Sequence, residues 1–345
     1  MDIKNKILSQ SNQFKHYKEK SEKLSKENKK LKDKIEKLSS NEKYEKGISI
    51  IIPTYKGESY IQGLLDSLAN QTLSKELFEL IFVINGELDS TTDILKDFIL
   101  KNPEMNIIFT YTTTPGVSNA RNIGIEISQR EYIGFVDDDD YISEHYLESL
   151  YNHSAANRVV MTNFIDVDED TGEKSESYVI PFSEKRSGII DNAPITFRGL
   201  SSVTVAKIIP TYAIKTTKFN TELKSGVDIS YHARLYPKFD FEFFFIPKEE
   251  DAVYYRIKRT GSISRQELSY EFNILGRLGV IEDINRSIKE NKPNKKYLRY
   301  LKRQANIQVS RFMKEYLKQH PEDREKIMKD IEKRDLVYFP YDKLE

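Results

Sequence analysis

The chain has 345 residues, which is enough for one large hydrophobic core with additional segments. Its 54 lysines and arginines balance 54 aspartates and glutamates, and no recognition motif is present, so we expect no nucleic-acid partner. Cysteine is absent, which excludes thiolate catalysis, disulfides and zinc–cysteine sites. Because there is no signal-peptide pattern and no apolar run of about 18 residues, we expect a cytoplasmic protein, at most peripheral at the inner face of a membrane.

Residues 1–46 are lysine-rich and contain neither proline nor glycine. One heptad register places Leu24, Leu31 and Leu38 at d positions and Asn28 at an a position, a pattern typical of a coiled coil. A buried asparagine pairs best with its own copy, so we expect a homodimer through this segment. A single charged helix is the alternative. The 14 lysines, against 8 acidic residues, also permit contact with an anionic membrane surface.

From Gly47 onward, short apolar runs alternate with amphipathic segments, which favours β-α-β units with largely parallel strands. The expected strands and helices alternate in chain order at 48–52, 60–68, 80–84, 94–99, 107–111 and 120–127. Ligands of open α/β sheets bind beyond the carboxyl ends of the strands. The loops at 53–57, 85–89 and 137–140 are therefore candidate site segments.

The stretch YIGFVDDDD, Tyr132–Asp140, is an apolar run that ends in four consecutive carboxylates. Its β-branched and aromatic residues predict a buried strand with Asp137–Asp140 at the exit. Neighbouring carboxylates repel one another, and a divalent cation that carries a phosphate would compensate them. The alternative is that they cap a helix starting near Ser143.

The next segments are less regular. We expect a strand at 158–164, an acidic turn at 166–172, and loops to about residue 200 that would shape an acceptor pocket. Further expected elements are strands at 202–209 and 251–258, and a loop followed by a helix within 218–236.

The chain has a helical pattern from about residue 268 to residue 334. Residues 286–318 hold 11 lysines and arginines against Glu290 and Glu315. This imbalance would suit anionic lipid or an anionic acceptor polymer, whereas a solvated helix face is the alternative.

Four segments resemble, in order and spacing, the inverting family-two glycosyltransferases of the GT-A fold. They are ISIIIPTYKGESYIQGLLDSLANQT, PGVSNARNIGIEISQREYIGFVDDDD, FNTELKSGVD and VYYRIKRTGSIS. They are similar to the family's opening strand and turn, its Gly-x-x-x-Ala-Arg-Asn segment continuing into Asp-x-Asp, its Gly-Glu-Asp segment, and its last strand and loop. The resemblance implies an α/β fold of the GT-A (Rossmann-like) type, with a mixed sheet flanked by helices. We expect a coiled coil at 1–46, a GT-A catalytic domain at 47–265 and a helical region at 266–345.

The resemblance also implies roles for the acidic run and for Arg121. Asp139, together with Asp137, would hold Mn²⁺ or Mg²⁺, which offsets the charge of a leaving diphosphate. Asp137 and Asp138 would contact the nucleotide donor, with Asp138 and Asp140 available to the donor sugar or to a helix cap. Arg121 matches the family's arginine, whose fork can donate to base or phosphate oxygens.

The opening turn is the second implied donor contact. Pro53, Thr54 and Tyr55 resemble the turn that contacts the nucleoside, and the Tyr55 ring would stack on the base. Core packing is the alternative for Tyr55.

Asp228 matches the family's catalytic base. An inverting transfer needs one carboxylate on the acceptor side to take the hydroxyl proton while the nucleotide leaves from the opposite face. An N-cap role for Asp228 is also expected, because a helical pattern follows it.

Several positions depart from the family pattern. Asn85 stands where an acid commonly contacts uracil; its amide can accept or donate, so it is a donor-binding candidate that also permits cytidine. Val227 replaces a glutamate that commonly precedes the base. The last loop has Arg256, Lys258 and Arg259 but no histidine metal ligand, so either the metal has fewer protein ligands or these cations take over part of the diphosphate stabilisation. His232, one turn after Asp228, is expected to be structural.

The resemblance implies an inverting, metal-assisted glycosyltransferase that uses a nucleotide-sugar donor, with UDP the favoured nucleotide. The acceptor would be a hydroxyl of a polysaccharide or polyol-phosphate precursor, such as wall teichoic acid, capsule or a lipid-linked oligosaccharide. The alternative is a catalytically degenerate scaffold of the same fold, recruited through its coiled coil and basic helices.

Overall fold

The computed structural model describes residues 44–177, 187–190, 194, 199, 203–259 and 268–344. The expected coiled coil, its dimer and the single-helix alternative lie at residues 1–43, outside the described residues. The predicted helical segment nevertheless ends too late at residue 46, because Glu45 and Lys46 already belong to the first strand.

The larger sheet has eight strands in the order β3-β2-β1-β4-β10-β6-β11-β9. Its parallel half consists of β1 (Glu45–Thr54), β2 (Phe78–Asn85), β3 (Asn106–Thr112) and β4 (Arg130–Phe135). The other strands are β10 (Lys207–Pro210), β6 (Arg158–Met161), β11 (Glu242–Phe245) and β9 (Gly188–Ile189). Because β10 runs antiparallel to both β4 and β6, the sheet is mixed, as the GT-A resemblance implied.

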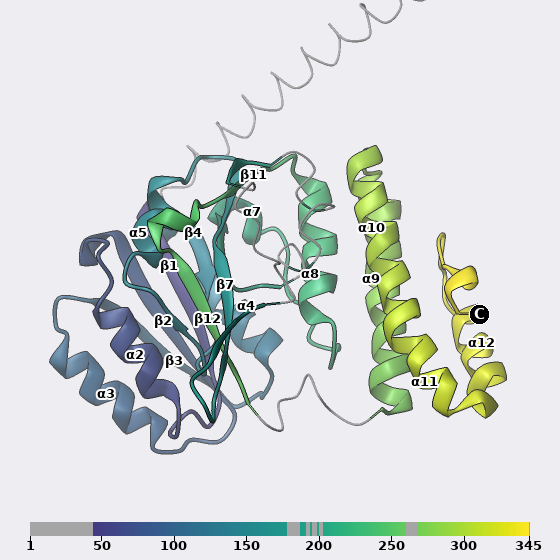
Figure 1. The fold of residues 1–345 in the computed structure, drawn as a ribbon, viewed down its shortest axis with the longest axis horizontal. Helices are drawn as coiled ribbons and strands as arrows, with labels where there is room; N and C mark the ends of the chain where they lie inside the picture. The colour runs from purple at the N-terminus through teal and green to yellow at the C-terminus, as the bar shows by residue number, and fades with distance from the viewer. Residues whose placement is uncertain are drawn as a thin grey trace, which may run out of the picture. The chain divides into compact units, whose positions relative to one another are not determined.

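Helices α2 (Ile61–Ala69) and α3 (Thr91–Lys101) contact one another and follow β1 and β2 in the chain (Figure 1). Helix α2 buries Ile61, Leu64, Leu65 and Leu68, the stripe that its sequence pattern predicts. Helix α4 (Val117–Ile127) packs on β1 and β2. The packing is close at Gly124, where an added Cβ would lie 2.4 Å from Cγ2 of Ile51.

A second sheet has the order β5-β12-β7-β8, formed by β5 (Tyr141–Ile142), β12 (Val253–Lys258), β7 (Asn163–Asp168) and β8 (Lys174–Glu176). The predicted single strand at 158–164 is therefore wrong, because β6 and β7 belong to different sheets. The chain changes sheet at Thr162, whose amide donates to Ala206 O (3.1 Å) and whose hydroxyl donates to Ala252 O. The acidic turn begins later than the predicted residue 166, because Asp166 to Asp168 still belong to β7.

The remaining helices are α5 (Tyr146–Asn152), α7 (Thr211–Ile214), α8 (Val227–Leu235), α9 (Gly276–Asn291), α10 (Lys295–Ile307), α11 (Lys314–Gln319) and α12 (Arg324–Glu332). Short 3₁₀ turns are η1 (Lys75–Leu77), η2 (Tyr236–Lys238), η3 (Lys248–Glu250), η7 (Pro321–Asp323) and η8 (Tyr341–Lys343), and π-helical turns are η5 (Glu271–Leu275) and η6 (Gln308–Met313). The predicted strand at 202–209 is limited to β10. Within the described residues, no helix combines the length and apolar character needed to span a bilayer.

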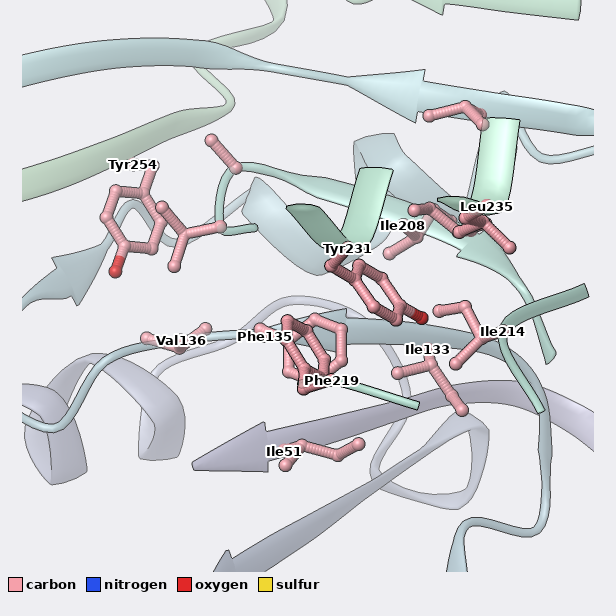
Figure 2. Close-up of a cluster of buried hydrophobic side chains, with 14 of the residues drawn as sticks. Ile51, Ile133, Phe135, Val136, Ile208, Ile214, Phe219, Tyr231, Leu235 and Tyr254 are labelled. Atoms are coloured by element: carbon pink, nitrogen blue, oxygen red, sulfur yellow. The ribbon is translucent and has the colours of Figure 1, made fainter. Parts of the chain in front are cut away.

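An aromatic core joins β4 to α8 (Figure 2). Phe219 stacks on Tyr231 with ring centroids 3.8 Å apart and contacts Phe135 of β4 edge-on at 5.7 Å. Helix α9 packs beside α8 (Figure 1). The core thus fixes α8, which carries Asp228, relative to the end of β4, which leads into the acidic run.

Candidate active site

Arg121 joins two segments that are far apart in the sequence. Its Nη2 donates to Asp137 Oδ1 and its Nη1 donates to Asp228 Oδ1, both at 2.9 Å. Arg121 is only 5% exposed, yet burial is outweighed by the two carboxylates, which raise the pKa of its guanidinium. The arginine therefore stays charged and holds both acids in one site.

Asn122, the next residue, explains why these segments meet. Its Nδ2 donates to Phe219 O (3.0 Å), and its Oδ1 accepts from Phe219 N (2.7 Å). This pair of bonds fixes the start of the FNTELKSGVD segment against α4. The predicted site residues Arg121, Asp137 and Asp228 are thus brought together by a neighbour whose role the sequence analysis did not anticipate.

Asp140 has a structural role. It is buried and accepts bonds from the Tyr254 hydroxyl (2.6 Å) and from Ile257 N (2.8 Å). The Tyr254 hydroxyl also accepts from Asp137 N (3.2 Å), so β12 fixes the backbone of the acidic run at two points. Burial raises the pKa of Asp140 well above its usual range. These bonds leave Asp137, Asp138 and Asp139 as the half-buried acids of the run.

Two of the three remaining acids, Asp138 and Asp139, are poorly compensated, whereas Asp137 is paired with Arg121. Burial, followed by repulsion from Asp139, raises the pKa of Asp138 to about 8, although Tyr55 N donates to its Oδ2 at 3.1 Å. Burial and Asp137 likewise raise the pKa of Asp139, whose Oδ2 lies 3.6 Å from Arg259 Nη1. The site therefore gains from additional positive charge.

Both helix-capping alternatives are wrong. Helix α5 begins at Tyr146, after His145, and makes no side-chain cap bond, so Asp137–Asp140 do not cap it. Helix α8 has Gly226 at its N-cap and likewise no side-chain cap bond. Asp228 lies in the first turn of α8, and its carboxylate faces Arg121.

The predicted nucleoside turn follows β1. Pro53 and Thr54 are buried, whereas Tyr55 is 46% exposed, so its core-packing alternative is wrong. Gly86 has φ +91°, and an added Cβ there would lie 2.9 Å from the Tyr55 ring. A glycine thus allows this loop to lie against one edge of an aromatic ring that is otherwise open to a ligand.

Asn85 has structural partners on both sides of its amide. Its Nδ2 donates to Thr54 O (2.9 Å), and its Oδ1 accepts from Gly116 N (2.9 Å). It ties the turn after β1 to the loop before α4, where Gly116 has φ +135°. Recognition of the nucleotide base by Asn85 stays a prediction. The observed hydrogen bonds of Asn85 show that it positions the turn after β1.

Asp228 has one oxygen that Arg121 does not engage. Thr204 N approaches this Oδ2 at 3.4 Å. Lys207 is buried nearby, and burial lowers its pKa to about 7 while the charge of Asp228 opposes the shift. His232 is fully buried, and its Nδ1 lies 2.8 Å from Asp228 O, in agreement with a structural role. A lysine inside the apolar run at 203–209 was the sequence signal for this buried cation.

The three cationic side chains at the end of β12 have different partners. Arg256 and Lys258 both pair with the buried Asp166, at 2.6 and 2.8 Å. Arg259 follows the strand, approaches Asp139 and lies over the Tyr60 ring, with its Cζ 3.8 Å from the ring centroid. Of these three cations, Arg259 is therefore the one that reaches the acidic run.

The acidic side chains of the site supply only part of the ligand shell that a divalent cation needs. Among the described residues, no group of three or more acidic, histidine or cysteine side chains is arranged to hold a metal ion. Mg²⁺ and Mn²⁺ commonly take one or two carboxylates and complete their shell with water and phosphate oxygens. Asp139, which is poorly compensated, fits that limited contribution together with Asp137, which also pairs with Arg121.

The loop of Asp228 rests on the C-terminal helices. Gly226 has φ +68°, and an added Cβ would lie 2.6 Å from Val280 Cγ2 of α9. Asp283 of α9 is buried and accepts bonds from Ser230 Oγ (2.5 Å) and Asn220 Nδ2 (3.0 Å). The C-terminal region thus supports the candidate base directly.

We expect Gly226→Ala to lower both the melting temperature and any turnover. A left-handed φ costs a residue with a Cβ about 1–2 kcal/mol, and the overlap with Val280 adds to this. In a Val280→Ala background the same substitution should cost less, because the overlap is removed. Gly63→Ala in α2 is the matched control, since an added Cβ there meets nothing within 4 Å. Equal effects of Gly226→Ala in both backgrounds would contradict the proposed contact.

The mixed sheet and the acidic run beyond β4 define a GT-A fold. The model of Glycosyl transferase family 2 matches residues 49–226, just over half of the chain. The chain belongs to this family, and the fold and family that its motifs indicated are confirmed.

Two relatives and two solved structures are similar to parts of the chain. It is 42% identical over 115 residues to a Bacillus spizizenii poly(ribitol-phosphate) beta-glucosyltransferase, covering 33% of this chain and 18% of the relative. It is 30% identical over 193 residues to the Bacillus subtilis minor teichoic acid biosynthesis protein GgaB, covering 54% and 21%. The chain thus spans about a fifth of the length of each.

The two structures share the fold. S. aureus TarS 1-349 in complex with UDP has a TM-score of 0.57 and 21% identity, covering 79% of this chain and 72% of TarS. A Pyrobaculum calidifontis mannosyltransferase in complex with GDP-Man and Mn²⁺ has a TM-score of 0.53 and 13% identity, covering 81% and 77%. GT-A folds similar to this one therefore bind nucleotides or nucleotide sugars, in one case with a divalent metal.

Proposed function

We propose that the protein is an inverting glycosyltransferase that moves a sugar from a UDP-linked donor to a hydroxyl of a polyol-phosphate polymer, such as a teichoic acid precursor. The observation that carries this proposal is the buried Arg121, which holds Asp137 on the donor side next to Asp228 on the acceptor side. The names of the relatives support the polymer, and the UDP complex of TarS supports the nucleotide.

In this mechanism Asp228 is the base. Its Oδ1 is bound to Arg121, so Oδ2 takes the proton of the acceptor hydroxyl. As the acceptor oxygen bonds to the anomeric carbon, the bond from that carbon to the diphosphate oxygen breaks and the nucleotide leaves from the opposite face. Arg121 keeps the carboxylate oriented throughout.

On the donor side, the exposed Tyr55 ring offers a stacking surface for the base. Arg259 pairs with Glu169 through Nε (3.3 Å), and its Nη1, which approaches Asp139, would turn to the diphosphate when Asp139 binds a metal ion. A metal held by Asp139 and Asp137 would supply Lewis-acid stabilisation of the leaving diphosphate. The proposed location is the cytoplasmic side of a membrane, and the homodimer through residues 1–46 stays a prediction.

Donor hydrolysis separates the enzyme from the scaffold alternative. With Mn²⁺ present, we expect slow release of UDP from a UDP-sugar even without acceptor, because water can replace the acceptor hydroxyl. Screening several UDP- and CDP-sugars by thermal shift identifies the donor, since a ligand of the folded state raises the melting temperature. Absence of both hydrolysis and donor binding would favour the scaffold.

Asp139→Ala should weaken Mn²⁺-dependent UDP binding at least about tenfold, because one of two carboxylate ligands is lost. Binding without metal should not weaken, since a negative charge near the diphosphate is removed. Calorimetric titration with and without Mn²⁺ measures both. Asp97→Ala, at an exposed position of α3, is the matched control. Unchanged dependence on Mn²⁺ would remove Asp139 from the metal site.

A further inference from the structure

A groove of about 720 Å³ lies on the C-terminal helices, where α10 meets the segment after α12. Apart from Leu298, its walls are formed by basic and polar residues, whose hydrocarbon parts also line it: Lys295, Arg299, Lys302, Arg303, Asn306 and Tyr338. No acidic side chain is among the described residues that line it. The groove is separate from the site residues assigned above, and its charge has a single sign.

Three cations of the groove lack carboxylate partners among the described residues. Lys295, Arg299 and Lys302 form no ion pair with any residue in the described part of the chain. Cations just outside the groove are compensated, since Lys296 pairs with Asp240 at 3.1 Å and Lys289 pairs with Asp335. The positive charge is thus concentrated on one face of α10. Like charges at these spacings repel one another unless an anion lies between them.

The wall opposite α10 is held in place. Tyr338 N donates to Asn285 Oδ1 (2.7 Å), and Tyr338 O accepts from Asn285 Nδ2 (3.0 Å). Its hydroxyl donates to Asn306 Oδ1 (2.6 Å), while Lys302 Nζ lies 4.8 Å from the centroid of its ring. Asn285 itself is buried in α9. The groove is therefore preformed, which lowers the ordering cost of binding.

We propose that this groove binds successive phosphates of an anionic polyol-phosphate chain, so that the acceptor polymer is held at a second site while its hydroxyl reacts at Asp228. The inference rests on the proposed function, which supplies a polymer of this chemistry. Lys295, Arg299 and Lys302 follow one another at about one cation per helical turn, which gives a row of charges along the helix. A linear polyanion can enter a concave groove, whereas a flat lipid surface favours protruding side chains.

The test uses the full chain and a synthetic ribitol-phosphate oligomer. Fluorescence anisotropy of the labelled oligomer, at several salt concentrations, measures affinity and its salt dependence. Arg299→Gln together with Lys302→Gln should weaken binding about tenfold and flatten the salt dependence, because two phosphate contacts are lost. Arg324→Gln together with Lys329→Gln removes the same charge from exposed positions of α12 and should change affinity less than about twofold.

Two further readouts, donor hydrolysis and vesicle binding, interpret a failure. Hydrolysis of the UDP-sugar should be the same in the groove variant and in the wild type, because the donor site is untouched. If hydrolysis is normal but both double variants bind the oligomer as the wild type does, the groove is overturned while the proposed function stands. Equal losses of oligomer affinity in the two double variants would indicate general charge attraction and would also overturn the groove proposal. Binding to phosphatidylglycerol vesicles that depends on Arg299 and Lys302, without oligomer binding, would assign the groove to a membrane instead.

Discussion

Asp228→Asn should reduce sugar transfer by about 10²–10⁴-fold, the range that positioned proton transfer contributes in enzymes. The amide oxygen can still accept the bond from Arg121, so the geometry of the site should persist, whereas an amide cannot take the acceptor proton. UDP binding with Mn²⁺ should therefore stay within about twofold of the wild type. Steady-state transfer assays and calorimetric titration of UDP measure the two quantities separately.

The control for this variant is Asp335→Asn, which changes the same chemical group at a side chain that is 94% exposed and pairs with Lys289. It should leave transfer unchanged. An Asp228→Asn variant that transfers sugar at more than a tenth of the wild-type rate would exclude Asp228 as the base. Loss of UDP binding in the same variant would instead indicate that Asp228 acts through the structure of the site.

Local pattern was sufficient to predict the parallel half of the larger sheet. The centres of β1, β2 and β4, at residues 48–52, 80–84 and 132–135, are apolar apart from Ser49 and Gly134, as expected of strands buried on both faces. The same pattern failed at Thr162, because two polar residues, Thr162 and Asn163, do not by themselves indicate that the chain changes sheet between Met161 and Phe164. That change depends on hydrogen bonds to Ala206 and Ala252, which are distant in sequence.

The candidate site was likewise predictable only where local motifs determine it, and not where distant residues pair. The family resemblance predicted roles for Asp137, Asp139, Arg121 and Asp228, but not that Arg121 pairs with both Asp137 and Asp228. Such a pairing joins residues 107 positions apart, which periodicity cannot reveal. Alternation in β12 could have separated Arg256 and Lys258 from Arg259, since residues two apart share one face of a strand.

Support of the candidate base, Asp228, by α9 gives the C-terminal helices a role in both proposed sites. Asp283 and Val280 on one side of α9 contact the segment that carries Asp228. Asn285 of the same helix fixes Tyr338 in the basic groove. A single helix thus links the position of the base to that of the proposed polymer site, which would keep the distance between them constant during transfer.

Arg121→Met should lower the free energy of unfolding by about 2 kcal/mol and abolish transfer. Removing one partner of a buried ion pair commonly costs about 3–5 kcal/mol. We discount this value because the Asp137 and Asp228 side chains are 37% and 33% exposed, so solvent screens the charges left behind. Transfer should be lost because Asp228 is no longer oriented. Calorimetric unfolding and transfer assays measure the two effects.

A double-mutant cycle distinguishes this interaction from a loss of packing against Phe135 and Phe219, whose ring centroids lie 6.0 and 5.5 Å from the Arg121 Cζ. If the ion pairs dominate, Arg121→Met should cost clearly less stability in an Asp228→Asn background, since one carboxylate then has no charge to leave unpaired. If packing dominates, the cost should be the same in both backgrounds. Arg158→Met, which breaks a more exposed pair with Glu242, is the matched control and should cost less than about 1 kcal/mol. Equal losses for Arg121→Met and Arg158→Met would contradict the central role assigned to Arg121.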